Sequence, residues 1–133
     1  MIDPILNKLL RPVLVLLAKP FVRFGISADQ ITIVGFLLGM LAVPAIIAEH
    51  FTVALVLIII NRICDGLDGA VARQTHTTDA GGFLDISLDF IFYSAIIFAF
   101  IVSHPEQNSL AGSLLMLSFT ATGSCFLTFS IMA

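Results

Sequence analysis

The sequence predicts an all-α, multi-pass bundle of transmembrane helices, preceded by an amphipathic helix at the membrane interface. Of its 133 residues, 59% are hydrophobic and only 11% are charged, whereas a soluble domain carries roughly 25% charged residues. Long apolar runs recur along the chain and are separated by short polar segments. These features exclude a soluble globular domain and a disordered chain, and they favour an integral membrane protein.

Charge and cysteine content exclude further classes of protein. Six Lys and Arg against nine Asp and Glu give a net charge of −3. Because the chain also lacks a basic stripe, nucleic-acid binding is not expected. Cys64 and Cys125, its two cysteines, both lie in apolar segments. Neither a disulfide framework nor a zinc site is therefore expected.

Residues 1–25 predict a helix that lies in the membrane interface. Apolar side chains alternate with the cations Lys8, Arg11 and Lys19. The longest uncharged run covers only residues 12–18, whereas about 20 apolar residues are needed to span a bilayer. Interleaved cations are typical of an interfacial amphipathic helix. In a secretory signal peptide the cations would precede the apolar run.

Four membrane spans are expected to follow, over about residues 29–48, 51–72, 80–103 and 110–133. Ser27 and Gln30 have the spacing of a capping box, which predicts the start of the first span. Within that span Gly35 and Gly39 form a GxxxG motif, which lets another helix approach closely. Residues 103–109 are expected to form a polar turn before the last span.

The second and third spans are predicted to carry polar residues within their helices. The apolar run from Phe51 ends at Ile60, which gives about 15 Å of helix, half of the ~30 Å hydrocarbon core. The apolar run over residues 90–103 is also too short. Each helix must therefore extend through acidic residues, which are Asp65 and Asp68 in the second span and Asp85 and Asp89 in the third.

The distribution of cations predicts the orientation of the bundle. Four cations precede the first span, and Arg62 and Arg73 lie near the junction of the second and third spans. All six cations therefore fall on one side. The positive-inside rule then places the amino terminus and the aspartates at the cytoplasmic face.

The aspartates repeat at helical spacing, so each group shares one face of its helix. Asp65 and Asp68 are three residues apart, and Gly81, Asp85 and Asp89 follow one another at intervals of four. The short link between the two spans predicts antiparallel neighbouring helices. Their acidic faces are expected to meet across a shared cavity.

Four carboxylates this close together would repel one another. Placing each charged side chain within a membrane helix costs on the order of 3 kcal/mol of free energy. Arg62 and Arg73 cannot neutralise all four, so either several are protonated or divalent cations lie among them. Oxygen ligands favour Mg²⁺, Mn²⁺ or Ca²⁺ over zinc, and Mg²⁺ held this way commonly binds a substrate phosphate. Arg73 offers a bidentate fork for phosphate. Four glycines allow a ligand to approach the backbone: Gly66, Gly69, Gly81 and Gly82.

The pattern D-x2-D-G-x2-A-R, a gap of seven residues, and then G-x3-D-x3-D resembles the signature of the CDP-alcohol phosphatidyltransferase family. The resemblance extends over the whole chain. It implies a membrane enzyme that transfers a substituted phosphate group from a CDP-linked donor, usually CDP-diacylglycerol in bacterial members, to a small alcohol, releasing CMP. It also implies a homodimer and six spans, so we expect a chain truncated at its carboxyl end and inactive by itself. A bacterial member would lie in the inner membrane.

The resemblance also implies roles for individual residues. The ligands of the divalent metal, Mg²⁺ or Mn²⁺, would be Asp65, Asp68, Asp85 and Asp89. Asp89 would also act as the general base. The groups in contact with the cytidine nucleotide would be Gly69, Ala72, Arg73 and Gly81. Family members often have P-N-x2-T before the first span, where this chain has Ala28, Asp29 and Thr32. Whether Asp29 and Thr32 contact the nucleotide stays open.

Three other functions fit parts of this pattern. A membrane prenyltransferase also binds a diphosphate through aspartates and Mg²⁺, but its acidic motifs have a different spacing. A divalent-cation transporter would need an ionisable pathway to the far side, and the first and fourth spans offer none. The third alternative is a non-catalytic subunit of a larger assembly. The sequence identifies neither the acceptor alcohol nor which of Mg²⁺ and Mn²⁺ is native.

Overall fold

The structure, a computed structural model, describes residues 3–132, with side chains from residue 12 to 129 and at 132. This part of the chain forms helices α1 (Asp3–Arg23), α2 (Ala28–Met40), α3 (Ala42–Ile47), α4 (Phe51–Gln74), α5 (Asp79–Ser103) and α6 (Pro105–Met132). The predicted all-α fold is confirmed. Residues 1, 2 and 133, which fall in the first and last predicted segments, lie outside the described residues.

Three segments are long and apolar enough to cross a membrane: Ala28–Ile47, Asp79–Ser103 and Pro105–Phe129. They correspond to the predicted first, third and fourth spans. The predicted second span is also helical, because α4 continues without a break through the acidic residues to Gln74. Arg62, Asp65 and Asp68 interrupt the apolar sequence of α4, so its crossing of the membrane stays a prediction.

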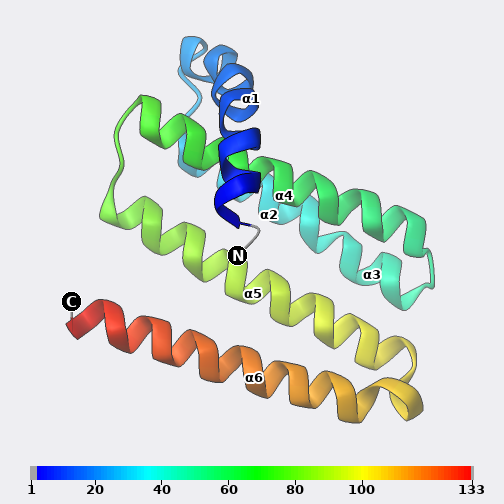
Figure 1. Cartoon of the computed structure of the whole chain (residues 1–133). Coiled ribbons are helices and arrows are strands. Elements are labelled where there is room, and N and C mark those ends of the chain that lie inside the picture. Colours follow the sequence, from blue (N-terminus) through cyan, green and yellow to red (C-terminus); the bar gives the residue numbers. More distant parts are fainter. Residues whose placement is uncertain (1–2, 133) are drawn as a thin grey trace.

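The helices after α1 form an antiparallel array (Figure 1). The segment α2–α3 packs against both α4 and α5, whereas α6 packs against α5. α1 runs at a steep angle to the others and packs against α4. α4 and α5 are antiparallel neighbours (Figure 1), as predicted, and they meet through long side chains: Arg62 of α4 and Asp89 of α5 lie 2.6 Å apart. The backbones of α4 and α5 are less closely packed with each other than each is with α2–α3.

The first span begins as predicted but is interrupted near its end. Ser27 Oγ accepts from the Gln30 backbone N–H at 3.3 Å, and Gln30 Oε1 accepts from the Ser27 N–H at 3.0 Å, so the capping box is confirmed. The helix breaks at Leu41 into α2 and α3. Pro44 explains the break, because a proline has no N–H to donate to the carbonyl four residues earlier and its ring crowds that carbonyl.

The last helix starts earlier than the sequence indicated. Residues 103–109 were expected to form a turn, but α6 begins at Pro105 and only His104 separates it from α5. Proline suits the first position of a helix, where an N–H has no partner within the helix. The Asn108 side chain then donates to the Phe100 carbonyl at 2.7 Å and closes the tight connection.

The amino-terminal segment is helical as predicted, although it contains Pro12 and Pro20. Ala18 is fully buried against α4, while Lys19 is exposed. The side chains of Lys8 and Arg11, which supported the amphipathic assignment, lie outside the described residues. The position of α1 in the membrane interface stays a prediction.

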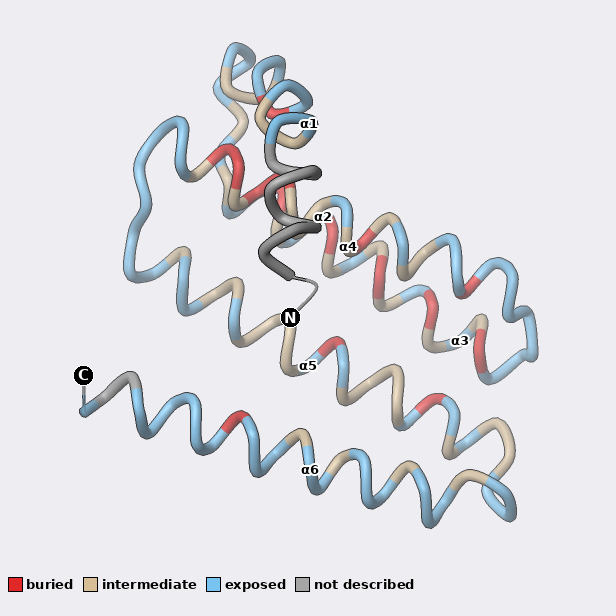
Figure 2. Tube along the Cα trace, in the orientation of Figure 1, coloured by how far each residue is buried: buried red, intermediate tan, exposed pale blue. Residues whose placement is uncertain are grey.

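Buried residues are few and lie mainly along α2–α3 and α4 (Figure 2). One cluster joins α1, α2 and α4, and a second joins α3, α4 and α5. α6 is exposed along nearly its whole length (Figure 2), although its side chains are largely apolar. A broad apolar exterior is what a protein surrounded by lipid presents, since a soluble monomer rarely exposes such a large patch.

The GxxxG motif allows α2 to approach α4, as the sequence predicts. A Cβ atom at Gly35 would lie 2.5 Å from the Cβ of Cys64, and one at Gly39 would lie 2.9 Å from the Cβ of Asn61. Gly35→Ala is therefore expected to lower the free energy of unfolding by about 1–3 kcal/mol through overpacking. Resistance to unfolding in SDS, followed by helical circular dichroism, measures the effect.

Gly82→Ala is the matched control for this substitution. A Cβ atom at Gly82 meets nothing within 4 Å, so the control should keep or raise stability, because alanine in a helix loses less conformational freedom on folding. Equal stability of the two variants would show that the contact between α2 and α4 tolerates an added methyl group.

Candidate functional site

The predicted nucleotide-binding residues line one cavity of about 210 Å³ at the end of the bundle where α4 finishes and α5 begins. Its walls come from α2, α4, α5 and the turn between α4 and α5. The motif residues on these walls are Asp68, Gly69, Ala72, Arg73, Gly81 and Asp85. The structure therefore brings together all four predicted nucleotide contacts and two of the predicted metal ligands.

A second, much smaller cavity adjoins the first and is surrounded by acidic side chains. Its volume is about 10 Å³, close to the space that one water-sized sphere occupies. The residues common to both cavities are Thr32, Asp68 and Asp85. All four predicted metal ligands line the smaller one: Asp65, Asp68, Asp85 and Asp89. The predicted meeting of the two acidic faces is confirmed, although the backbones of α4 and α5 are not closely packed.

α2 supplies polar side chains whose role the sequence left open. Asp68 is only 4% exposed, and the hydroxyl of Thr32 donates to its Oδ2 atom at 2.5 Å. Asp29 lines the larger cavity beside Gly81. A Cβ atom at Gly81 would lie 2.8 Å from Asp29 Oδ1, so the carboxylate of Asp29 reaches the bare backbone at Gly81. Asp29 and Thr32 are therefore part of the site.

Arg73 and Gly69 form one wall of the larger cavity. A Cβ atom at Gly69 would lie 3.2 Å from Nη1 of Arg73, so the guanidinium folds back over the bare glycine backbone. The Arg73 side chain is exposed. It can therefore donate two parallel hydrogen bonds to a phosphate in the cavity, as the sequence analysis expected.

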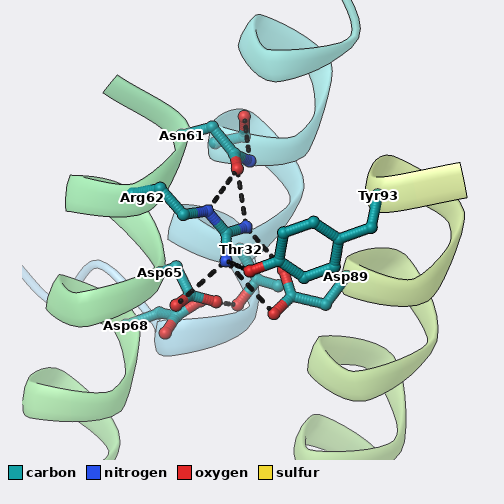
Figure 3. A network of polar contacts seen from close by, with 8 residues as sticks. Thr32, Asn61, Arg62, Asp65, Asp68, Asp89 and Tyr93 are labelled. Carbon is teal, nitrogen blue, oxygen red and sulfur yellow. Dashed lines mark hydrogen bonds and ion pairs between the residues drawn. The ribbon is translucent and has the colours of Figure 1, made fainter. Parts of the chain in front are cut away.

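A network of polar contacts centred on Arg62 lies beside the smaller cavity and includes Asn61, Asp65 and Asp89 of its lining (Figure 3). Its guanidinium donates to both carboxylate oxygens of Asp89, at 2.6 and 3.3 Å, and to the Tyr93 hydroxyl at 2.6 Å. It also lies 3.7 Å from Asp65 Oδ2. Sequence reasoning named Arg62 only as a partial neutraliser of charge, and it missed Asn61 and Tyr93.

Helical spacing contained a signal for two of these residues. Arg62 precedes Asp65 by three residues, and Tyr93 follows Asp89 by four. Residues three or four apart share a face of a helix. Extending each acidic face by one turn would therefore have included Arg62 and Tyr93. Asn61 has no comparable signal, because its buried amide contacts the Gly35 carbonyl of another helix.

The donor set fits a hard divalent cation. The candidate ligands are carboxylates, and oxygen ligands suit Mg²⁺ or Mn²⁺. Asp65 and Asp85 approach each other closely, and two carboxylates in such contact repel unless a proton or a cation lies between them. Within the described part of the chain, however, no three His, Cys, Asp or Glu side chains converge on one point. The carboxylates surround the small cavity but do not form a complete coordination shell.

The sequence model of the CDP-alcohol phosphatidyltransferase family matches residues 25–132. The chain belongs to this family. The match confirms the resemblance inferred from the aspartate motif, and it includes every residue of the two cavities. Together with the three apolar helices, it establishes an integral membrane protein.

Several relatives of this family member have been curated. It is 48% identical over 133 residues to the inner membrane protein YnjF of Escherichia coli, covering 100% of this chain and 65% of the relative. It is 34% identical over 83 residues to an archaetidylinositol phosphate synthase of Pyrococcus horikoshii, covering 62% of this chain and 44% of that protein. No solved structure matches the chain.

A third relative is a bifunctional IPC transferase and DIPP synthase of Aquifex aeolicus, 42% identical over 85 residues. The alignment covers 59% of this chain and 19% of that protein. The chain therefore spans less than two thirds of the length of each of these three relatives.

Proposed function

We propose that this protein is a membrane transferase of phospholipid synthesis. It transfers a phosphatidyl or other substituted phosphate group from a CDP-linked donor, CDP-diacylglycerol in the first instance, to a small alcohol with release of CMP. The observation that carries the proposal is the meeting of the four family aspartates and Arg73 around two adjoining cavities. Family membership over residues 25–132 supports the same activity.

The larger cavity is the proposed site of the cytidine diphosphate group. Its contacts would be the backbone and side chains of Gly69, Ala72, Arg73 and Gly81. Arg73 would pair with a phosphate through its guanidinium fork. α5 begins at the edge of this cavity, with Thr78 as N-cap, and the amino-terminal end of a helix favours negative charge.

Asp65, Asp68 and Asp85 are the proposed ligands of Mg²⁺ or Mn²⁺. Such a cation would neutralise charge on the diphosphate and on the departing CMP. Thr32 donates to one oxygen of Asp68 and so fixes the orientation of that carboxylate. Asp89 lies one turn beyond Asp85 on α5 and is proposed to accept the proton of the acceptor hydroxyl.

The proposed location of the site is the cytoplasmic side of the membrane, in the inner membrane if the protein is bacterial. Both cavities lie toward the end of the bundle that carries Arg73 and the turn between α4 and α5. A donor lipid could then keep its tails in the bilayer while its nucleotide enters from the cytoplasm. A homodimer is proposed from the family resemblance.

Single-cysteine labelling tests this orientation. His76 and Gln107 are exposed near opposite ends of α5, and we replace each by cysteine in a protein without Cys64 and Cys125. In inverted vesicles an impermeant thiol reagent should label position 76, and in right-side-out vesicles it should label position 107. Labelling of both positions from one side would contradict the proposed topology.

CMP release is the direct test of the proposed activity. The protein, at its natural length and in lipid nanodiscs, is incubated with CDP-diacylglycerol, Mn²⁺ and one acceptor at a time. The panel contains glycerol 3-phosphate, serine and an inositol phosphate, the last because two relatives are named for archaetidylinositol phosphate. We expect CMP release that depends on one acceptor, stops in excess chelator and returns with added Mg²⁺ or Mn²⁺.

Two results would contradict the proposal at different points. If no acceptor supports CMP release by folded protein, the assigned reaction is wrong. If nucleotide binding is undiminished in excess chelator, the aspartates do not hold the donor through a cation. An uptake of divalent cations into vesicles without CMP release would favour transport instead.

A further inference from the structure

Arg62 extends from α4 toward α5, and hydrogen bonds use all five of its N–H groups. Nε and Nη2 donate to Asn61 Oδ1 at 2.9 and 2.6 Å. Nη2 and Nη1 donate to the two oxygens of Asp89, and Nη1 also donates to the Tyr93 hydroxyl (Figure 3). A guanidinium has five N–H donors. Arg62, unlike Arg73, therefore has none left for a substrate phosphate.

The position of this guanidinium is fixed from three helices. Asn61 is 5% exposed, and its amide donates to the Gly35 carbonyl of α2 at 3.0 Å. The rings of Phe92 and Tyr93 on α5 lie 5.2 and 4.9 Å from the Arg62 Cζ atom, within the range of a cation–π contact. Because these neighbours restrain Arg62, they also restrain the carboxylate that Arg62 binds.

Asp89 differs from the other three aspartates in this respect. Both of its oxygens accept hydrogen bonds from Arg62. Asp65 is more distant from the guanidinium, at 3.7 Å, and Asp68 accepts from a neutral hydroxyl. Asp68 and Asp85 line the larger cavity, whereas Asp65 and Asp89 line only the smaller one of the two. Asp89 therefore already has a bound cationic group, which a metal ion would have to displace.

We propose that Arg62 is a positioning residue that keeps Asp89 out of the coordination shell of the divalent cation. Three aspartates, Asp65, Asp68 and Asp85, then bind the metal, and Asp89 is held as a separate carboxylate beside it. A carboxylate has about four lone-pair sites, so the Arg62 fork leaves positions on Asp89 for the hydroxyl of an acceptor. The inference rests on the proposed function for the identity of the metal site, and it adds the role of Arg62 to it.

Binding of Mn²⁺ alone tests the role of Arg62, by titration calorimetry and by the electron paramagnetic resonance signal of the bound ion. The proteins compared are the unmodified chain, Asp89→Asn, Arg62→Gln and the double variant. Asp89→Asn should leave Mn²⁺ affinity unchanged while Arg62 is present. Arg62→Gln should raise the affinity and alter the resonance signal, because Asp89 becomes a ligand. In that background Asp89→Asn should lower the affinity by about tenfold or more.

Arg62→Lys and Asp85→Asn complete the design. Lysine keeps the charge of arginine but not its bidentate fork. The Mn²⁺ affinity of Arg62→Lys should therefore lie between that of the unmodified chain and that of Arg62→Gln. Asp85→Asn should weaken Mn²⁺ binding in every background. If Arg62→Gln does not fold, the two asparagine variants still test the proposal. It requires a large loss of Mn²⁺ affinity for Asp85→Asn and no loss for Asp89→Asn.

Two outcomes would overturn the role of Arg62. One is an equal effect of Asp89→Asn on Mn²⁺ affinity with and without Arg62. The other is the absence of Mn²⁺ binding by the unmodified protein. A protein that shows the expected binding pattern but releases no CMP from CDP-diacylglycerol would contradict the proposed function alone, and the positioning of Asp89 by Arg62 would stand.

Discussion

Asp89→Asn is expected to lower turnover by about 10²–10⁴-fold, the typical contribution of general acid–base catalysis. Asparagine keeps the shape of the side chain and one oxygen for Arg62, but it cannot accept a proton from the acceptor alcohol. The affinity for CDP-diacylglycerol should change little, because Asp65, Asp68 and Asp85 still hold the metal. Steady-state CMP release and donor binding, measured separately, give the two quantities.

Asp79→Asn is the matched control for this substitution. Asp79 is an exposed carboxylate in the first turn of α5, on the same helix as Asp89, and it lines neither cavity. The control should retain turnover. Because Asp89→Asn removes an ion-pair partner of Arg62, helical circular dichroism must first show that the variant is folded. Near-normal turnover of folded Asp89→Asn would mean that another group accepts the proton.

Asp85→Asn is expected to weaken both metal binding and donor binding. Asp85 lies on both cavities and close to Asp65, so it is placed to contact a cation that also contacts the diphosphate. We expect a loss of at least about 10–100-fold in metal affinity, the loss that even an outer-shell partner of a metal causes when it is replaced. Mn²⁺ titration and donor binding at several metal concentrations measure the effect.

The contrast between Asp85 and Asp89 carries this prediction. Excess Mn²⁺ should partly restore donor binding to Asp85→Asn, since mass action compensates for a weakened site. Asp79→Asn again serves as the control and should bind metal normally. If Asp85→Asn keeps normal metal affinity, Asp85 is a structural partner of Asp65 and the cation is held elsewhere.

Local sequence signals determined most of the secondary structure. The capping box at Ser27 acts within four residues, and the helical spacing of the aspartates predicts their shared faces whatever surrounds them. One break within a helix was missed and one helix start was predicted wrongly, although a local signal was present in each case. Pro44 interrupts the first span, and Pro105 starts the last helix before its apolar run begins.

The residue pattern alone predicted that four aspartates on two neighbouring helices face one another, and the resemblance to the family suggested the proposed chemistry. The partners of these carboxylates became visible only in the three-dimensional fold. This fold places Thr32 against Asp68 and Arg62 against Asp89, pairs that lie 36 and 27 residues apart in the chain. Such pairs depend on how helices approach one another, as α2 approaches α4 at Gly35 and Gly39. That packing arises from the summed fit of many side chains, which periodicity and local spacing do not specify.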